Sequence, residues 1–221
     1  MCIRDSLYNY GENQLKVIYN NARSFKKHYI DVKENYNMLA ANVICIAESQ
    51  LGPGDDTESY HIEGYHVYRL DQANTVNAYH GIMVYVCDTQ VVSHAIWYPG
   101  HNIEAIKLVL EHGMNQLCVI AIYSSPQTQA TELYTTLHEI LIECDNVPVI
   151  IIGDFNIQTP KDNTNSLCNY MKAVYKCNHY VNKSTTKYNT TIDLVFSNLS
   201  NLTAGTIDCY WSDHKMVYTV I

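Results

Sequence analysis

The chain has 221 residues, of which 47% are hydrophobic and 16% charged, and its formal net charge is -8. This composition is typical of a folded globular protein and excludes an intrinsically disordered one. The length suits one large α/β domain or two small ones. Isolated DNA-binding modules are usually basic, so the acidic balance disfavours that class, but it leaves room for an enzyme whose carboxylates hold a metal ion.

Cysteine usage points to a reduced protein. The chain has eight cysteines and no CxxC pair, and Cys45, Cys87 and Cys118 lie inside apolar runs that predict strands. Cysteines scattered through a core are usually packed thiols, so we expect neither a disulfide framework nor a zinc site. No early apolar run suits a secretory signal, and no segment approaches the ~20 apolar residues of a membrane span. We therefore expect an intracellular protein without a membrane partner.

The start of the chain carries little structural signal. Residues 1–14 show no apolar period and no motif, so we expect a flanking or artefactual segment outside the domain. Residues 15–221 contain no internal repeat and no linker-like stretch, and we predict that they form one domain.

Along this domain, short apolar runs that predict strands are interspersed with amphipathic segments that predict helices. We expect strands at residues 15–20, 42–49, 65–70, 81–87, 103–110, 116–124, 191–198 and 215–221, with another beginning at Val149. We expect helices at residues 25–39, 130–143 and 167–175, and a loop at 50–64. This mixture favours an α/β sandwich, in which two sheets pack face to face with helices outside.

The run VIIIGDFN, residues 149–156, places Asp154 and Asn156 at the end of a buried strand. Because alternate residues of a strand share a face, both side chains can project toward one cleft if the strand geometry continues that far. A carboxylate can orient or deprotonate a water, and a carboxamide can donate to a phosphoryl oxygen, which suits a reaction at phosphorus. The alternative is a turn, for which Gly-Asp-x-Asn is equally suitable.

Other predicted strands also end beside polar residues that can bind a metal or a phosphate. Each residue alone has an ordinary explanation, such as a solvated loop acid, a satisfied buried acid, a turn or a surface histidine. Their recurrence at successive strand ends is harder to explain in this way and predicts one shared site. These residues are Asn21, Glu48, Tyr123, Asp193, Ser212, Asp213 and His214.

The motifs NARS, GDFN, TTIDLVFSN and SDH follow one another in this order, with Glu48 and Tyr123 between the first two. From residue 15 to 221 the sequence resembles the endonuclease/exonuclease/phosphatase superfamily, and most of all the endonuclease domains of non-LTR retrotransposons and helitron-type elements. The resemblance implies a four-layered α/β sandwich of two mixed sheets flanked by helices. It also implies a Mg²⁺-dependent phosphodiesterase that nicks DNA, with Mn²⁺ as a substitute ion.

The same resemblance implies roles for the polar residues at the strand ends. Glu48, Asn21 and Asp213 would bind the metal through oxygen atoms. Asp154 would align or activate the attacking water, and Asn156 would hold the phosphate.

The remaining roles concern the phosphate and the histidine. Tyr123 would donate to the phosphate, and Ser212 would support the loop of His214. His214 would contact the phosphoryl oxygens or act as a base, oriented by Asp193 through its other ring nitrogen. Thr186 matches a phosphate-contacting threonine, and its neighbour Thr185 is an equal alternative.

Two departures from the superfamily bear on the substrate. Arg23 stands where the abasic-site repair enzymes have an aspartate, so we expect no preference for abasic sites. His80 lies where the mobile-element group often has Arg-Gly-Gly, and we assign His80 no role. A basic cluster at the start of the predicted first helix could reach DNA phosphates. It consists of Arg23, Lys26, Lys27 and His28.

The expected partners are duplex DNA and other domains of the same mobile-element protein, a reverse transcriptase or a helicase, with a nuclear location. Two alternatives remain. One is a phosphatase or phosphodiesterase acting on a small-molecule or lipid phosphate ester. The other is a catalytically dead remnant of an element, against which the full set of polar residues counts.

Overall fold

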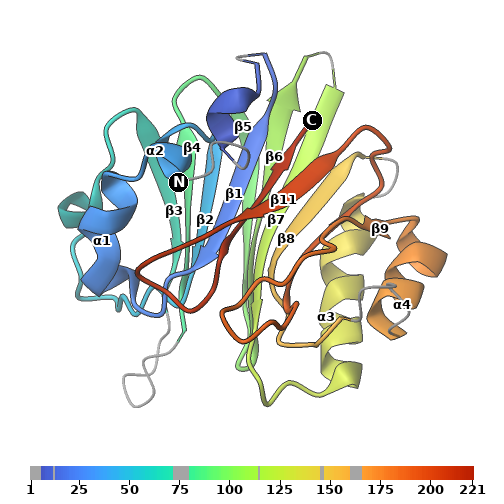
Figure 1. The fold of residues 1–221 in the computed structure, drawn as a ribbon. Helices are drawn as coiled ribbons and strands as arrows, with labels where there is room; N and C mark the ends of the chain where they lie inside the picture. Colours follow the sequence, from blue (N-terminus) through green and yellow to red (C-terminus); the bar gives the residue numbers. More distant parts are fainter. Residues whose placement is uncertain (1–5, 12, 72–79, 114, 145–146, 160–165) are drawn as a thin grey trace.

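The protein is an α/β sandwich of four layers, as the sequence predicts (Figure 1). The computed structural model describes residues 6–11, 13–71, 80–113, 115–144, 147–159 and 166–221. Two six-stranded mixed sheets face each other, with α1 and α2 outside the first sheet and α3 and α4 outside the second. Within the described residues, none of the helices is long and apolar enough to cross a membrane.

The first sheet has the strand order β11–β12–β1–β2–β4–β3. Strands β1 and β2 run parallel, and the other neighbours in this sheet are antiparallel. The strands are β1 (Lys16–Asn21), β2 (Val43–Ala47), β3 (Tyr65–Leu70), β4 (Ile82–Cys87), β11 (Thr203–Ile207) and β12 (Met216–Val220).

The second sheet has the order β5–β6–β7–β8–β10–β9, with β7 and β8 as its parallel pair. The strands are β5 (Val92–Pro99), β6 (Ile103–His112), β7 (Asn115–Ser124), β8 (Val149–Asp154), β9 (Asn178–His179) and β10 (Asp193–Ser197). The sequence analysis missed β5, β9 and β11. β5 is an edge strand whose residues are mostly half-exposed, so it lacks the continuous apolar run that marks a central strand.

The helices confirm two of the three predicted segments. The predicted single helix over residues 25–39 is wrong, because the chain turns after α1 and the Asn35 side chain accepts from the backbone N–H groups of Asn37 and Met38 to start a new helix. The α-helices are α1 (Phe25–Lys33), α2 (Tyr36–Leu39), α3 (Ala130–Leu141) and α4 (Ser166–Tyr175). The short 3-10 helices are η2 (Leu7–Asn9), η3 (Thr57–Tyr60) and η4 (Ile142–Cys144).

Part of the segment that the sequence analysis places outside the domain packs against it. Leu7 is fully buried in the apolar layer beneath α1 and α2. Ser6 donates to the Asn37 side chain, and the Leu7 N–H donates to the same oxygen, each at 3.2 Å. The absence of an apolar period in so short a stretch therefore did not indicate absence of packing.

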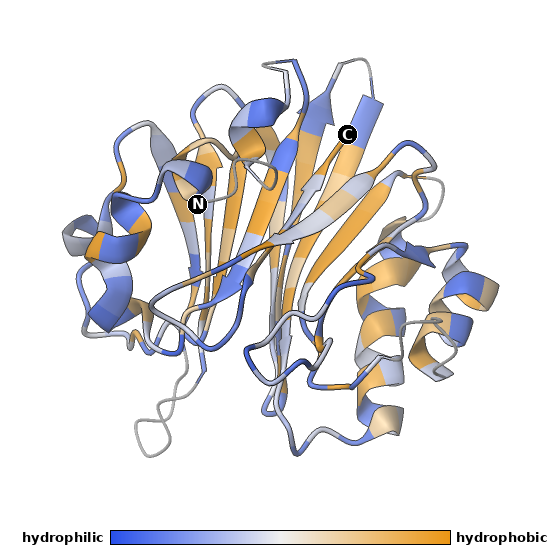
Figure 2. Cartoon of the chain, in the orientation of Figure 1, coloured by the Kyte–Doolittle hydropathy of each residue, from blue (hydrophilic) through white to orange (hydrophobic). Residues whose placement is uncertain are grey.

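Apolar side chains fill the space between the sheets and beneath the helices, and Figure 2 shows them concentrated along the strands. The parallel pairs set the place of the polar residues. Asn21 ends β1 beside Ala47 of β2, and Tyr123 pairs with Asp154 at the end of β8. Asp193 opens β10 directly opposite Asp154. The carboxyl ends of the central strands in both sheets thus meet at one end of the sandwich.

Gly153, one residue before Asp154, gives a test of this packing. A Cβ added there would lie 1.9 Å from the Ile122 carbonyl oxygen of the neighbouring strand. We expect Gly153→Ala to lower the free energy of unfolding, measured in urea, by about 1–3 kcal/mol, because the backbone must shift. Gly54→Ala is the control, since nothing lies within 4 Å of its added Cβ, and it should change stability by less than about 0.5 kcal/mol. Equal stability of both variants would contradict this packing.

Candidate active site

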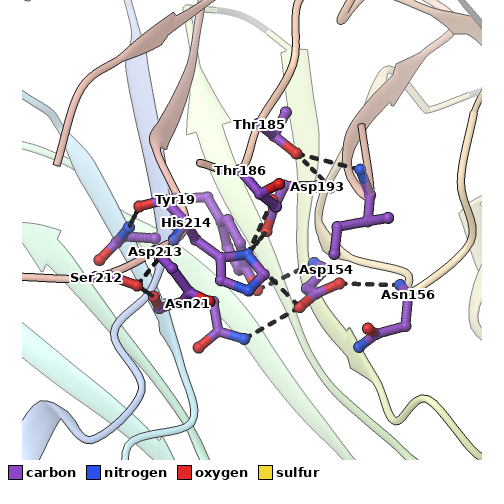
Figure 3. Close-up of polar contacts among 12 residues, drawn as sticks. Tyr19, Asn21, Asp154, Asn156, Thr185, Thr186, Asp193, Ser212, Asp213 and His214 are labelled. Carbon is purple, nitrogen blue, oxygen red and sulfur yellow. Dashed lines mark hydrogen bonds and ion pairs between the residues drawn. The ribbon is translucent and has the colours of Figure 1, made fainter. Parts of the chain in front are cut away.

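Asp154, Asp193 and His214 form a buried cluster where β8, β10 and the loop before β12 meet (Figure 3). One ligand atom from each residue lies within 4.8 Å of the others. His214 Nδ1 is 3.0 Å from each carboxylate oxygen of Asp193 and 3.9 Å from Asp154 Oδ2. Asp193 therefore holds one ring nitrogen and leaves Nε2 for another partner.

Burial and mutual charge shift the protonation of this cluster. Burial raises the pKa of Asp154 to about 8, and the neighbouring charge of Asp193 adds to this effect. Burial lowers the pKa of His214, but the charges of Asp193 and Asp154 outweigh it and raise the value to about 9. At neutral pH the imidazole is therefore cationic, and burial favours the protonated form of Asp154.

Asn21 and Glu48 lie beside this cluster, at the ends of the parallel strands of the first sheet. Asn21 Nδ2 donates to Glu48 Oε1 at 2.8 Å and to Asp154 Oδ2 at 3.0 Å, so one carboxamide joins the two acids. Burial raises the pKa of Glu48, while the Asn21 hydrogen bond and the positive charge of Arg23 oppose the rise. Tyr123 also hydrogen-bonds to Glu48.

Two sets of residues fit a metal ion differently. Asp154, Asp193 and His214 have metal-like spacing, but Nδ1 of His214 is engaged by Asp193, and Mg²⁺ prefers oxygen ligands. Glu48 offers carboxylate oxygens, and a cation would compensate the cost of burying this carboxylate. Its neighbour Asn21 turns Nδ2 toward Glu48, and the Asn21 Oδ1 accepts the Arg23 N–H. The Glu48 carboxylate therefore suits Mg²⁺ better by its chemistry than the cluster that contains His214.

Asp213, the third residue assigned to the metal by the sequence, is paired with another group. Its Oδ1 lies 2.9 Å from Nε of Arg23, whose side chain is 55% exposed. Arg23 follows directly on Asn21 and Ala22, and its N–H donates to the Asn21 side chain. The cation next to Asp213 in this structure is thus a guanidinium.

Asn156 does not continue the strand. β8 ends at Asp154, Phe155 is buried, and Asn156 has a left-handed backbone with φ of 50°. Its N–H donates to Asp154 Oδ1 at 2.9 Å, and its Nδ2 donates to the Ser124 carbonyl at 2.7 Å. The turn interpretation therefore describes the backbone, although the turn still places Asn156 beside Asp154 (Figure 3).

The loop before β12 is tied to the first strand. Ser212 Oγ donates to the Asn21 carbonyl at 2.7 Å and accepts from the His214 N–H at 3.1 Å. Asn20 adds a second tie, because its Oδ1 accepts from Trp211 Nε1 and its Nδ2 donates to the His214 carbonyl. Ser212 thus joins the His214 backbone to the end of β1.

The two candidate threonines differ in their surroundings. Thr185 Oγ1 accepts from the N–H groups of Ile192 and Asp193, so it supports the start of β10. Thr186 pairs through its backbone with His214 and shares a hydrogen bond with Thr190. Thr186 also lines the hollow next to His214, which makes it the better candidate for a phosphate contact.

Strained backbone accompanies several of these positions. Arg23, Glu48 and Asn156 all have positive φ, at 51°, 51° and 50°, although none is glycine. Such conformations cost about 1–3 kcal/mol each and persist where surrounding contacts over-determine them, often at functional sites. Each of them lies at or just beyond the end of a strand that carries a site residue, where the chain must turn sharply.

The sequence analysis missed three buried polar residues that belong to the site's support: Tyr19, Asn20 and Glu104. The Tyr19 hydroxyl accepts from the Asp154 N–H at 3.0 Å, across the space between the sheets. Tyr19 and Glu104 sit inside apolar runs and Asn20 ends one, so no spacing rule singles these side chains out. A polar residue within a predicted core strand was the available signal.

The basic cluster at the start of α1 is largely neutralised. Arg23 pairs with Asp213, Lys26 with Asp55 at 2.6 Å, and His28 with Asp31 at 2.9 Å. A different basic surface lies next to His214, where a hollow of about 320 Å³ opens. Its lining residues are Thr186, Lys187, Asn189, Asp208, Cys209, His214 and Lys215.

The sequence and the fold were compared with those of known proteins. Residues 117–218 match the family model described as endonuclease-reverse transcriptase. No curated protein sequence matches the chain. The chain is similar to the endonuclease domain of TRAS1, a telomere-specific non-LTR retrotransposon, with 14% identity and a TM-score of 0.69 over 94% of this chain and 98% of that one.

Two bacterial structures are similar to the same extent. One is an endonuclease/exonuclease/phosphatase family protein from Bacteroides thetaiotaomicron, with 14% identity and a TM-score of 0.68 over 94% of this chain and 97% of that one. The other is a mannosyl-6-phosphatase from the same species, with 12% identity and a TM-score of 0.66 over 94% and 99%. At these identities the likeness shows the fold, which serves proteins named for different substrates.

The charge balance at His214 can be measured directly. We expect an NMR titration to give His214 a pKa well above that of an ordinary histidine and Asp193→Asn to lower it, because the charge that outweighs burial is removed. Asp88→Asn is the control, since Asp88 lies 3.4 Å from the exposed His66 and should leave His214 unchanged. An unaltered His214 titration in Asp193→Asn would contradict the pairing.

Proposed function

We propose that the chain is a member of the endonuclease/exonuclease/phosphatase superfamily and a metal-dependent endonuclease that nicks duplex DNA on behalf of a mobile element. The observation that carries the proposal is one connected network of buried groups. Asn21, Glu48, Asp154, Asp193 and His214 converge from both sheets, and each lies within hydrogen-bond distance of another member. Its acids and its cationic imidazole suit phosphodiester hydrolysis.

The geometry assigns a different task to each side chain. Asp154, with its pKa raised to about 8, is suited to accept a proton from the attacking water. His214, with its pKa raised to about 9, is suited to donate from Nε2 to a phosphoryl oxygen while Asp193 holds Nδ1. This favours the phosphate contact over the base role that the sequence analysis left open for His214.

A metal ion completes this arrangement in the proposal. Glu48 would hold it through its carboxylate, and Asn21 would join only when its Oδ1 leaves the Arg23 N–H. When bound, the ion would neutralise charge on the phosphate and the leaving oxygen. Asp213 is paired with Arg23, so it could bind the same ion only if this ion pair breaks. The Glu48 carboxylate is therefore the principal ligand in our assignment.

Support for a DNA substrate comes from the family match and from the surface beside His214. The match of residues 117–218 to the endonuclease-reverse transcriptase family model favours an endonuclease that accompanies a reverse transcriptase. Lys187 and Lys215 line the hollow next to the histidine, where a phosphate adjoining the cleaved one could bind. Lys215 is also 3.1 Å from the exposed Asp208, so Lys187 is the stronger candidate.

The catalytic proposal predicts metal-dependent nicking. With Mg²⁺, the protein should convert supercoiled plasmid to the open-circle form, and excess chelator should stop the reaction. Glu48→Gln and Asp154→Asn should each slow nicking by about 100-fold or more, because one loses the main metal ligand and the other the proton acceptor. Asp88→Asn, an exposed acid away from the network, should nick at the wild-type rate.

Two outcomes would contradict this function. Equal nicking in chelator would remove the metal from the mechanism. Release of phosphate from sugar or inositol phosphates without any nicking would identify a phosphatase, the alternative that shares this fold. Cleavage of abasic-site oligonucleotides should show no strong preference over plain duplex, since Arg23 replaces the acid found in abasic-site enzymes.

DNA affinity should be weak and only shallowly dependent on salt. The net charge of -8 repels DNA at long range, and Arg23 and Lys26 at the start of α1 are paired with acids, so few phosphates are neutralised. We expect a slope typical of ~2–4 phosphate contacts, measured with duplex DNA in chelator. Lys187→Ala should reduce this salt slope by about 1, because one phosphate contact is lost. Lys26→Ala, already paired with Asp55, is the control, and an equal effect of both would show that the hollow is not the DNA surface.

A further inference from the structure

Glu104 is a buried acid outside the network described above. It is the second residue of β6 and is only 3% exposed. Its strand partner is Tyr123, which hydrogen-bonds to Glu48. A carboxylate enclosed in this way is costly unless a donor compensates it, so its partner is informative.

That partner belongs to the other sheet. Glu104 Oε2 accepts the backbone N–H of Gly81 at 2.8 Å, just before β4 begins. The bond crosses from the second sheet to the first. Burial raises the pKa of Glu104 to about 7, with the Gly81 hydrogen bond opposing the rise.

Gly81 in turn holds the residues that follow Glu48. Its carbonyl accepts the Ser49 N–H at 3.0 Å, and the carbonyl of His80 accepts the Gln50 N–H at 3.0 Å. Gly81 has φ of +98°, and a Cβ there would lie 2.3 Å from Ser49 Oγ. Only glycine can therefore make this close approach.

Glu48 itself needs such support. Its backbone is left-handed, with φ of 51°, and Gln50 has φ of 55°. On the opposite side, the Glu48 carbonyl accepts the Phe25 N–H, which begins α1. The conformation of Glu48 is thus fixed between the start of α1 and the turn at Gly81.

We propose that Glu104 is a positioning residue for the active site: it holds Gly81 across the two sheets and, through Gly81 and Ser49, sets the orientation of Glu48 toward a divalent cation. The inference rests on the proposed function in one respect, the assignment of Glu48 as the metal ligand. His80, which the sequence analysis left without a role, contributes by packing edge-on against Tyr123, with ring centroids 5.4 Å apart.

The test compares two replacements of similar size. Glu104→Gln keeps an oxygen that can accept from Gly81, whereas Glu104→Leu fills the same space without an acceptor. Affinity for Mn²⁺ alone is measured by calorimetry, without DNA, on folded protein. We expect Glu104→Leu to weaken binding by ~10- to 100-fold, the usual effect of losing an outer-shell partner, and Glu104→Gln to restore it nearly to wild type.

A control and a second variant separate positioning from general stability. Ser197→Ala removes a buried hydrogen bond of 2.6 Å to the Val149 carbonyl in the same sheet, away from Glu48. It should lower the melting temperature and leave Mn²⁺ affinity unchanged. Gly81→Ala tests the link from the other side and should weaken Mn²⁺ binding, because its Cβ displaces Ser49.

Wild-type Mn²⁺ affinity in Glu104→Leu would overturn the proposal, and so would equal losses in Glu104→Leu and Glu104→Gln, which would show that charge rather than the acceptor matters. Should Glu104→Leu fail to fold, the comparison of Glu104→Gln with Gly81→Ala decides, and wild-type affinity in Gly81→Ala overturns it. If the wild type nicks DNA and these variants bind Mn²⁺ as well as the wild type does, the positioning role of Glu104 is contradicted and the proposed function is not. If the variants change Mn²⁺ affinity as expected but the wild type does not nick DNA, the positioning role is supported and the DNA-nicking function is contradicted.

Discussion

The hydrogen bonds that converge on Asp154 are the constraint on which the site depends. Its N–H donates to the hydroxyl of Tyr19, and its carboxylate accepts from Asn21, so a residue of the second sheet is fixed to β1 of the first. The N–H of Asn156 adds a third bond from the turn that follows. Because the apolar surfaces between the sheets are close-packed, these polar ties can form only where the central strands end together.

Charge balance follows from this convergence. Glu48, Asp154 and Asp193 are all buried, and His214 is the cation hydrogen-bonded among them. Arg23 adds charge from the edge, through its effect on Glu48 and its pair with Asp213. Burial raises the pKa of Glu48, and burial together with the charge of Asp193 raises the pKa of Asp154. The same burial favours the binding of a cation, so the tendency to take up protons and the tendency to take up a metal have the same physical origin.

The turns at the strand ends are as important as the strands. Glu48 and Asn156 both adopt left-handed backbones, and each is held by contacts from outside its own strand. Ser124 of the neighbouring strand β7 holds Asn156 within the second sheet, and Glu104 of β6 holds Gly81 across from the second sheet to the first. A loss of registry between the sheets would misplace the site residues together, which couples the core to the chemistry.

The sequence by itself determined the central strands, the helices over residues 130–143 and 167–175, and the identity of the polar residues that follow the strands, because apolar periodicity and strand-end polarity are local properties. It did not reveal the break between α1 and α2, the edge strand β5 or the pairing of Asp213 with Arg23, and it left open whether the chain continues as a strand or turns at Asn156. Nor did it single out Tyr19 or Glu104. These features depend on contacts between residues distant in the chain, and only the packing of one sheet on the other brings those partners within hydrogen-bond reach.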